Sequence, residues 1–252
     1  MAEKIDLVVF DLAGTTVDDT IDGLPLVTVA MIEAFACHGI KINHDQVNKV
    51  RGMDKRRAVQ CLLKEFEEVE LNNCLITSKC ANITNKTRLD SLDDIFKDFK
   101  LALNSHLINI NKEIPGTTTT FHWLKKRGIK LAVGSGFPHD VVLALVEKLG
   151  WKDLVEYVSS AEQEGHGRPH PSLIHSAMKH CSITNKRSVW KVGDTVMDIE
   201  EGRNAGCWTV AVQTGTQTET MLKQSNPDYM INSVADLPQL FEKVMAIHMT
   251  KI

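Results

Sequence analysis

The chain has 252 residues, of which 43% are hydrophobic and 24% charged, a balance typical of a globular protein with a substantial core. Its formal net charge of −3 provides no general attraction to nucleic acid or to an anionic membrane surface, so we expect neither as a partner. No apolar run is long enough to span a bilayer, and the N-terminal MAEKID lacks the features of a signal peptide. We therefore expect a cytoplasmic protein whose six cysteines are reduced and mostly buried.

The first predicted element is a buried strand at Leu7–Phe10, a short apolar run with β-branched residues. It leads directly into Asp11, which would then lie at the C-terminal end of the strand, where open α/β sheets bind ligands. Gly14 is suited to a tight turn, and the N–H groups of Gly14 and Thr15 are candidates for binding an anion. The simpler alternative is that Asp11 caps a turn or a helix.

The next segment, residues 20–114, has helical periodicity and no convincing strand. Helices are predicted at Leu24–His38, Asn43–Val50, Lys55–Val69, Leu71–Ile83 and Leu92–Ile110. This pattern predicts a separate helical domain inserted after the first strand.

From Pro115-Gly116 onward, strands and helices alternate. Further strands are predicted at Ile129–Val133, Val155–Ser159, Ser188–Val192, Trp208–Val212 and Tyr229–Ile231, and helices at Thr118–Arg127, Asp140–Leu149, Pro171–His180, Ile199–Ala205 and Leu237–His248. Alternation of this kind predicts an α/β fold with a parallel sheet covered by helices on both faces. The core domain would consist of residues 1–19 and 115–252.

Polar side chains follow several of these strands. Ser135 lies between Gly134 and Gly136, where a hydroxyl and free amides suit a phosphate oxygen. Asp194 and Asp198 lie four residues apart at the start of a helix. Because parallel strands end at one edge of a sheet, these groups can converge on Asp11. Three carboxylates at one point favour a hard cation such as Mg²⁺, although Asp194 and Asp198 can instead serve as helix caps.

The loop Gly165-His166-Gly167-Arg168-Pro169-His170-Pro171 is stiff and basic. Its two prolines restrict the backbone around Arg168, whose guanidinium can neutralise a transferring phosphoryl group. His166 and His170 are interpreted as loop residues, since no further Cys or His is spaced to complete a metal site.

Along the chain, the four elements are Asp11, Ser135, the Arg168 loop and the Asp194–Asp198 pair. In this order they resemble the haloacid dehalogenase superfamily, whose members are aspartate-nucleophile hydrolases with a Rossmann-like core. The resemblance covers essentially the whole chain, and the helical insert is similar to the cap domain of that superfamily. It implies that Asp11 is the nucleophile and that Mg²⁺ is held by Asp11, the Ala13 carbonyl and Asp194, with Asp198 as a direct or indirect ligand. The implied phosphate-binding residues are Gly14, Thr15, Ser135, Gly136 and Arg168.

The residue at position 13 indicates which branch of the superfamily the chain resembles. Phosphatases of the superfamily carry a second Asp two residues after the nucleophile, where this chain has Ala13. The sequences DLAGTTVD and GRPHP resemble the phosphonoacetaldehyde hydrolase branch, which cleaves a C–P bond. A carbon leaving group has no bridging oxygen to protonate, but it needs an electron sink, which in that branch is an imine on a lysine of the cap.

Lys55 matches the spacing of that lysine, three residues after Gly52. The chain departs from the branch at Arg51 and Ala58, where the branch has methionine and histidine. The alternative is that Lys55 belongs to a solvated run with the two arginines that follow it.

The sequence therefore predicts a Mg²⁺-dependent hydrolase that acts through an aspartyl-phosphate on a small phosphonate, with phosphonoacetaldehyde as the first candidate. Asp11, Lys55 and Arg168 are the predicted catalytic residues. The alternatives are a phosphatase acting on a small phosphate ester and a catalytically silent phosphate-binding protein. A homodimer is a further expectation.

Overall fold

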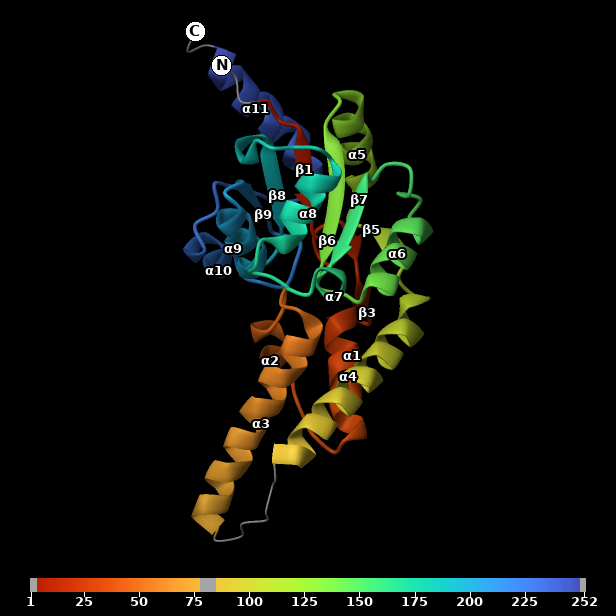
Figure 1. Ribbon diagram of the computed structural model, residues 1–252, viewed down its shortest axis with the longest axis vertical. Coiled ribbons are helices and arrows are strands. Elements are labelled where there is room, and N and C mark those ends of the chain that lie inside the picture. Colours follow the sequence, from red (N-terminus) through yellow and green to blue (C-terminus); the bar gives the residue numbers. More distant parts are fainter. Residues whose placement is uncertain (1–3, 78–84, 250–252) are drawn as a thin grey trace. The chain divides into compact units, whose positions relative to one another are not determined.

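The structure is a computed structural model that describes residues 4–77 and 85–249 (Figure 1). The chain divides into two compact units, one made of Met1–Asp19 and Ile110–Ile252 and the other of Thr20–Asn109. The return to the first unit lies at residues 109–110, a few residues before the boundary expected from the sequence. In the first unit, the outgoing strand β2 (Val17–Asp18) pairs antiparallel with the returning strand β5 (Lys112–Glu113).

A six-stranded sheet forms the centre of the first unit, with the order β10-β9-β8-β1-β6-β7. Every neighbouring pair is parallel, which confirms the predicted α/β fold. The strands are β1 (Leu7–Phe10), β6 (Lys130–Ser135), β7 (Tyr157–Ser160), β8 (Val189–Gly193), β9 (Trp208–Val212) and β10 (Tyr229–Ile231). Phe10, the last residue of β1, lies opposite Val133 of β6 and Val192 of β8, so Asp11 follows β1 beside the C-terminal ends of both neighbouring strands.

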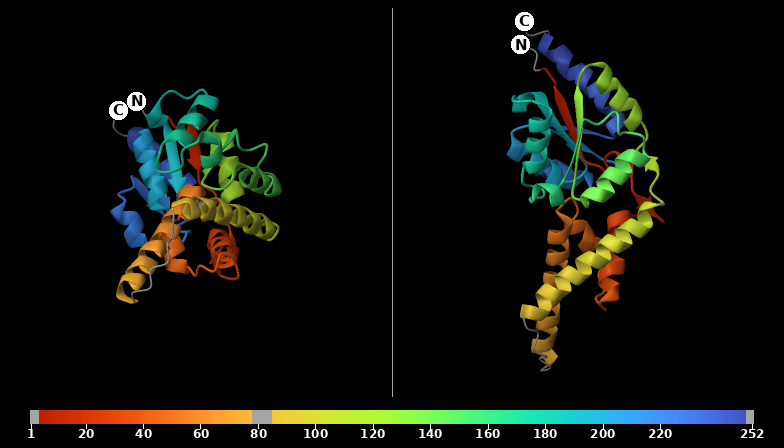
Figure 2. Two further views of the ribbon diagram at one scale, coloured as in Figure 1. Left: turned by 60° about the horizontal axis from the view of Figure 1, so that its bottom comes forward. Right: turned by 45° about the vertical axis from the view of Figure 1, so that its right-hand side comes forward.

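Helices cover both faces of this sheet. The right-hand view of Figure 2 shows α8 (Ser172–His180) and α9 (Val196–Ala205) on one face, and α5 (Thr117–Lys126) and α11 (Leu237–Met249) on the other. Alternate strand residues supply the two cores. Val9 belongs to the cluster that contains Ile174 of α8, whereas the ring of Phe10 packs 5.0 Å from that of Phe121 in α5. Burial of each such side chain stabilises the fold by roughly 1.5–3 kcal/mol.

Shorter elements complete the first unit. They are α6 (His139–Lys148), which contacts β7, together with α7 (Ala161–Glu164), α10 (Glu219–Gln224), and the 3₁₀ turns η1 (Lys186–Ser188) and η2 (Val234–Asp236).

Where it is described, at residues 20–77 and 85–109, the second unit consists of helices and one short hairpin. Its helices are α1 (Leu26–Cys37), α2 (His44–Lys49), α3 (Lys55–Thr77) and α4 (Asn85–Leu107), and α1 packs along α4. The hairpin joins β3 (Thr20–Ile21) to β4 (Leu24–Pro25). The prediction that the first helix includes Leu24 was therefore wrong. Asp22 and Gly23 both have positive φ, as a two-residue hairpin turn of the Asp-Gly kind requires, and this turn pairs Leu24 with Ile21.

The two helices predicted at Lys55–Val69 and Leu71–Ile83 form one continuous helix, α3, as far as Thr77. No proline or glycine interrupts the sequence around Glu70, so nothing ends the helix there. Residues 78–83 of the second predicted helix lie outside the described residues. Helix α4 also begins earlier than predicted, at Asn85 rather than Leu92.

Two further expectations concern the membrane and the thiols. Within residues 4–77 and 85–249, no helix is both long and apolar enough to cross a bilayer. Cys181 and Cys207 are buried free thiols in the first unit, whereas Cys37 and Cys61 are exposed free thiols on the helices of the second. The expectation of burial was therefore wrong for Cys37 and Cys61, which lie on solvent-facing positions of α1 and α3, and it was confirmed for Cys181 and Cys207.

Candidate active site

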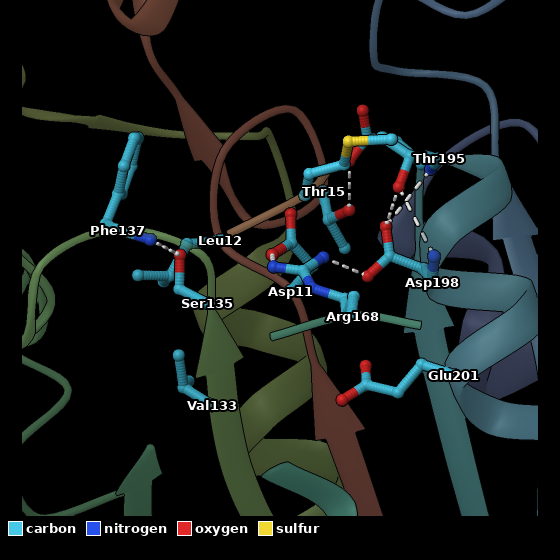
Figure 3. Close-up of polar contacts among 12 residues, drawn as sticks. Asp11, Leu12, Thr15, Val133, Ser135, Phe137, Arg168, Thr195, Asp198 and Glu201 are labelled. Carbon is cyan, nitrogen blue, oxygen red and sulfur yellow. Dashed lines mark hydrogen bonds and ion pairs between the residues drawn. The ribbon is translucent and has the colours of Figure 1, made fainter. Parts of the chain in front are cut away.

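The predicted site residues of the first unit meet at the C-terminal edge of the sheet (Figure 3). Asp11 follows β1, Ser135 ends β6, and Asp194 follows β8. All three are buried, with exposed fractions of 5%, 3% and 0%. The parallel sheet thus brings polar groups that lie far apart in the sequence together at one buried edge, where water screens charges poorly.

The loop after Asp11 is a tight turn organised by the carbonyl of Leu12. This oxygen accepts hydrogen bonds from the N–H groups of Thr15 (3.1 Å), Thr16 (2.8 Å) and Val17 (2.8 Å), and the Gly14 N–H donates to the Val17 carbonyl (2.9 Å). The amides of Gly14 and Thr15, predicted to bind a phosphate, both donate within this turn, so their phosphate contact stays a prediction. Within the described part of the chain, the N–H groups of Leu12 and Ala13 make no hydrogen bond, so they are the amides of this loop left for an anion.

Glycines let the backbone close around Asp194. Gly14 has φ +83°, and a Cβ added there would lie 2.8 Å from Asp194 Oδ2. A Cβ on Gly215 would lie 1.8 Å from the same oxygen. The hydroxyl of Thr15 donates to Asp194 Oδ1 at 2.8 Å, a side-chain role that the sequence did not indicate. Asp194 is thereby held in a space that admits no larger neighbouring residue.

Arg168 bridges two carboxylates. Its Nη2 donates to Asp11 Oδ1 at 2.7 Å, and its Nη1 donates to Asp198 Oδ1. Figure 3 shows the guanidinium between these two groups. Arg168 therefore pairs with two carboxylates that the sequence did not assign to it, and its predicted contact with a phosphoryl group stays a prediction. Its Nε makes no hydrogen bond among the described residues, so one N–H remains for a further acceptor.

The electrostatics of this pairing favour the charged forms. Burial lowers the pKa of Arg168, but the adjacent Asp11 and Asp198 carboxylates outweigh it, and the pKa is raised. Burial raises the pKa of Asp198, but the Arg168 and Lys191 cations and a hydrogen bond from Thr195 outweigh it, and the pKa is lowered. Both groups therefore stay charged at neutral pH.

Asp11, Asp194 and Asp198 form the one described cluster able to hold a metal ion. One oxygen of each carboxylate lies within 4.8 Å of the others, and all three residues are buried. Asp198 is already engaged through both oxygens, since Oδ1 faces Arg168 and Oδ2 accepts from Thr195 Oγ1 at 2.5 Å. The all-oxygen donor set fits a hard divalent cation, with Asp11 and Asp194 as the carboxylates best placed to be ligands.

A family model of the haloacid dehalogenase-like hydrolases matches residues 5–206. The chain belongs to the haloacid dehalogenase-like hydrolase family. This confirms the resemblance inferred from the four sequence elements, and it establishes the protein as a hydrolase.

Individual relatives agree in length as well as in sequence. The hydrolase is 27% identical to a phosphonoacetaldehyde hydrolase of Lactiplantibacillus plantarum, over 95% of this chain and 96% of the relative. It is 28% identical to a phosphonoacetaldehyde hydrolase of Bacteroides fragilis, over 96% of this chain and 97% of the relative. In fold it is similar to the crystal structure of a phosphonoacetaldehyde hydrolase-like protein from Oleispira antarctica, with a TM-score of 0.78 at 21% identity over 97% of this chain and 94% of that one.

Ser135 and Gly136 lie at the same edge of the hydrolase core. The Ser135 Oγ accepts a hydrogen bond from the Phe137 N–H at 3.2 Å, which leaves its own proton to donate to another acceptor. His166 and His170 stack on each other with ring centroids 4.6 Å apart, in keeping with their interpretation as loop residues.

Lys55 begins α3 in the second unit of the hydrolase. Its side chain is only 6% exposed, and its Nζ donates to the Met53 carbonyl at 3.2 Å, whereas Arg56 and Arg57 are exposed. The alternative that Lys55 is one more solvated charge was therefore wrong. Arg51 is also 6% exposed, so the residue that replaces the methionine of the phosphonoacetaldehyde hydrolase branch is a buried cation.

Two site residues were missed at the sequence level. Lys191 in β8 and Glu201 in α9 are both 0% exposed, and Lys191 Nζ lies 3.0 Å from Glu201 Oε2 and 3.1 Å from Asp198 Oδ1. Burial lowers the pKa of Lys191, but the two carboxylates outweigh it and the pKa is raised. The available signal was a lysine in the middle of an apolar strand, flanked by Trp190 and Val192.

Proposed function

We propose that this hydrolase cleaves the C–P bond of phosphonoacetaldehyde or of a closely related phosphonate, with Mg²⁺ as its cofactor. The observation that carries the proposal is Ala13, at the position where the phosphatases of the superfamily have their acid. Two relatives that match at least 95% of the chain are phosphonoacetaldehyde hydrolases, which supports the same substrate class.

The proposed nucleophile is Asp11. Its carboxylate is buried at the end of β1, and Arg168 holds one oxygen at 2.7 Å, which orients the other toward a substrate. Attack on phosphorus forms an aspartyl-phosphate, and water then hydrolyses this acyl phosphate to release inorganic phosphate and restore Asp11. The Ser135 hydroxyl, the Arg168 Nε and the Leu12 and Ala13 amides are the donors proposed to hold the phosphoryl oxygens.

The proposed ligands of Mg²⁺ are Asp11, Asp194 and the Ala13 carbonyl, with Asp198 in a supporting role. When bound, the ion supplies positive charge that offsets repulsion between Asp11 and an anionic phosphonate. Thr15 and the glycines at positions 14 and 215 hold Asp194 in place for this task.

The proposed role of Lys55 is to accept the leaving electrons. Its neutral amine condenses with the substrate aldehyde to form an imine and water. Cleavage of the C–P bond sends its electron pair into the imine, which becomes an enamine; protonation at carbon and hydrolysis then release acetaldehyde and free Lys55. This chemistry needs no acid at position 13.

A phosphatase acting on a small ester is the second candidate. Its support is that Arg51 and Ala58 depart from the phosphonoacetaldehyde hydrolase pattern. The fold is also similar to that of a predicted phosphoglycolate phosphatase from Haemophilus somnus, with a TM-score of 0.76 at 22% identity over 94% of this chain.

Assay of the purified protein with Mg²⁺ distinguishes the two candidates. We expect acetaldehyde and phosphate from phosphonoacetaldehyde, and far slower release of phosphate from esters such as phosphoglycolate. Chelation is expected to abolish turnover and Mg²⁺ to restore it. Efficient ester hydrolysis without C–P cleavage would establish the phosphatase instead.

The imine has its own test. Borohydride added during turnover of phosphonoacetaldehyde should trap an adduct on Lys55, detectable by peptide mass spectrometry. Lys55→Arg should be inactive, because it keeps the charge but forms no imine, whereas Arg57→Lys, at an exposed position two residues away, is the matched control and should stay active. An active Lys55→Arg variant with no trapped adduct would remove Lys55 from the mechanism; Ala13→Asp would then be expected to raise ester hydrolysis by restoring a general acid.

A further inference from the structure

A buried chain of alternating acidic and basic side chains extends from the nucleophile into the interior of the core. It runs from Asp11 through Arg168 to Asp198, then through Lys191 to Glu201. The last three members are 0% exposed and Arg168 is 3% exposed. The proposed reaction uses Asp11 and Arg168 directly but assigns no role to Lys191 or Glu201.

The backbone is shaped to bring Glu201 and Lys191 together. They belong to different elements, α9 and β8, which pack against each other. Gly202, next to Glu201, lets the helix approach so closely that a Cβ there would lie 2.6 Å from Thr209 Cγ2 and 3.0 Å from Lys191 Cβ. The resulting 3.0 Å contact between Lys191 Nζ and Glu201 Oε2 depends on this close approach.

Such a pair is a poor way to stabilise a core. Removing two charges from water costs several kcal/mol per ion, and apolar residues of similar volume are often equally or more stabilising. A role in stability alone therefore does not account for Lys191 and Glu201. Their position near Arg168 accounts for them, because Asp198 Oδ1 faces both Arg168 Nη1 and Lys191 Nζ.

We propose that Lys191 and Glu201 are positioning residues that hold Asp198 and thereby fix the orientation of the Arg168 guanidinium against Asp11. Lys191 holds Asp198 Oδ1 from the side of the core, and Glu201 holds Lys191 in turn. Thr195 holds the other oxygen, Oδ2, from the start of α9. Arg168 is thus presented with a carboxylate that cannot rotate, and Figure 3 shows Glu201 on the same side of α9 as this cluster. The catalytic consequence rests on the function proposed above, whereas the geometric one does not.

The test replaces the pair by apolar residues of similar size, in the variant Lys191→Met/Glu201→Leu. The matched control is Lys223→Met/Glu219→Leu, which removes an exposed Lys–Glu pair of 2.6 Å from α10 in the same unit. The first readout needs no substrate: the ¹H–¹⁵N signal of the Arg168 Nε group in arginine-labelled protein, assigned through Arg168→Lys. We expect the signal to shift or broaden in Lys191→Met/Glu201→Leu and to be unchanged in the control.

The second readout is steady-state kinetics on whichever substrate the protein hydrolyses. We expect kcat to fall about tenfold or more while KM changes less than about threefold, since the pair acts on the orientation of the reacting groups and does not touch the substrate. Glu201→Gln keeps an oxygen acceptor for Lys191 and should retain most of kcat. If Lys191→Met/Glu201→Leu fails to fold, Glu201→Leu and Glu201→Gln are compared in its place.

An unshifted Arg168 signal with kcat within about twofold of wild type would overturn the proposal and make the pair a structural element. A shifted signal with unchanged kcat would equally overturn it, because the orientation of Arg168 would then not limit the reaction. Absence of any turnover by the wild-type protein would instead contradict the proposed function, and the signal alone would then decide whether the pair positions Arg168.

Discussion

The ion pairs at the sheet edge of the first unit are buried, whereas those that join the helices of the second unit lie at its surface. The side chains of Arg168 and Asp198 are 3% and 0% exposed, and those of Arg56 and Asp93, on α3 and α4, are 48% and 57% exposed. A surface pair contributes little to stability because water screens it, but it also costs little to form. A buried pair costs much and interacts strongly, so it is suited to fixing the position and charge of reacting groups.

Removal of the nucleophile is expected to have the largest effect. Asp11→Asn keeps the size of the side chain but loses the negative charge that attacks phosphorus, so turnover should fall about a thousandfold or more. Turnover is measured by phosphate release and the fold by circular dichroism. Asp6→Asn, at a partly buried carboxylate just before β1, is the control and should keep its activity. Near-normal turnover in Asp11→Asn would contradict the mechanism.

Cysteine labelling probes the same contrast between a buried and an exposed environment. Burial raises the pKa of Cys207 to about 12, so the fraction of reactive thiolate at pH 8 is on the order of a thousand times smaller than for an unperturbed thiol. In protein carrying Cys74→Ser and Cys80→Ser, we expect Cys37 and Cys61 to react rapidly with iodoacetamide while Cys207 does not. Peptide mass spectrometry reads the sites, and equal labelling of Cys207 in native and urea-unfolded protein would contradict its burial.

Loss of the bridging arginine should destabilise the core strongly. Arg168→Ala removes the cation that pairs with the buried carboxylates of Asp11 and Asp198, which should lower the free energy of unfolding by about 3–5 kcal/mol. Turnover should be lost as well. Arg168→Lys should lie between wild type and alanine, because a single ammonium lacks the planar fork that spans both carboxylates. Urea denaturation measures the difference. It should shrink in acid, because the pKa of Asp198 is lowered in the folded protein and protonation of Asp198 removes the charge that Arg168 offsets. Unchanged stability in Arg168→Ala would mean that this edge is more hydrated than the structure indicates.

Crowding of Asp194 should have a moderate effect that falls on activity more than on stability. In Gly215→Ala the new methyl group would lie 1.8 Å from Asp194 Oδ2, so the carboxylate must move, and kcat should fall about 10–100-fold. Gly128→Ala is the control, because it strains the backbone without crowding a neighbour. Gly128 has a φ of +72°, so alanine costs about 1 kcal/mol of stability there, but no atom lies within 4 Å of the added Cβ and kcat should be unchanged. Equal kinetics for the two variants would show that Asp194 tolerates displacement.

The smallest effect is expected at the surface of the second unit. Arg56→Ala removes the exposed pair with Asp93 and a contact with the Phe96 ring at 5.6 Å, and should cost no more than about 1 kcal/mol of unfolding free energy. The ion-pair part of this cost should decrease in 1 M salt, because screening weakens exposed charges most. Thermal unfolding in low and high salt measures both, and a cost as large as that of Arg168→Ala would remove the contrast between the two sets of pairs.

Sequence patterns were most informative where local rules apply. The apolar run of β1 and the alternation after Pro115 predicted the parallel sheet, and its strand ends predicted that Asp11, Ser135 and Asp194 share one edge. They were less informative about the amides of Gly14 and Thr15, which close their own turn, and about the hairpin at Asp22-Gly23. In both places the backbone forms a local turn, and the pattern of apolar residues does not indicate which backbone groups such a turn uses.

By itself the sequence determined the order of strands and helices, the family, and which residue types stand at the ends of the strands, because these follow from spacing along the chain. Only the tertiary structure decided which charges meet. Arg168 pairs with Asp11 across 157 positions, and Thr15 donates to Asp194 across 179. Lys191 and Glu201 become part of the site only because Gly202 lets α9 approach β8. Periodicity specifies which face of an element is buried, whereas pairing of charges depends on distances of a few ångströms that arise when separate elements pack.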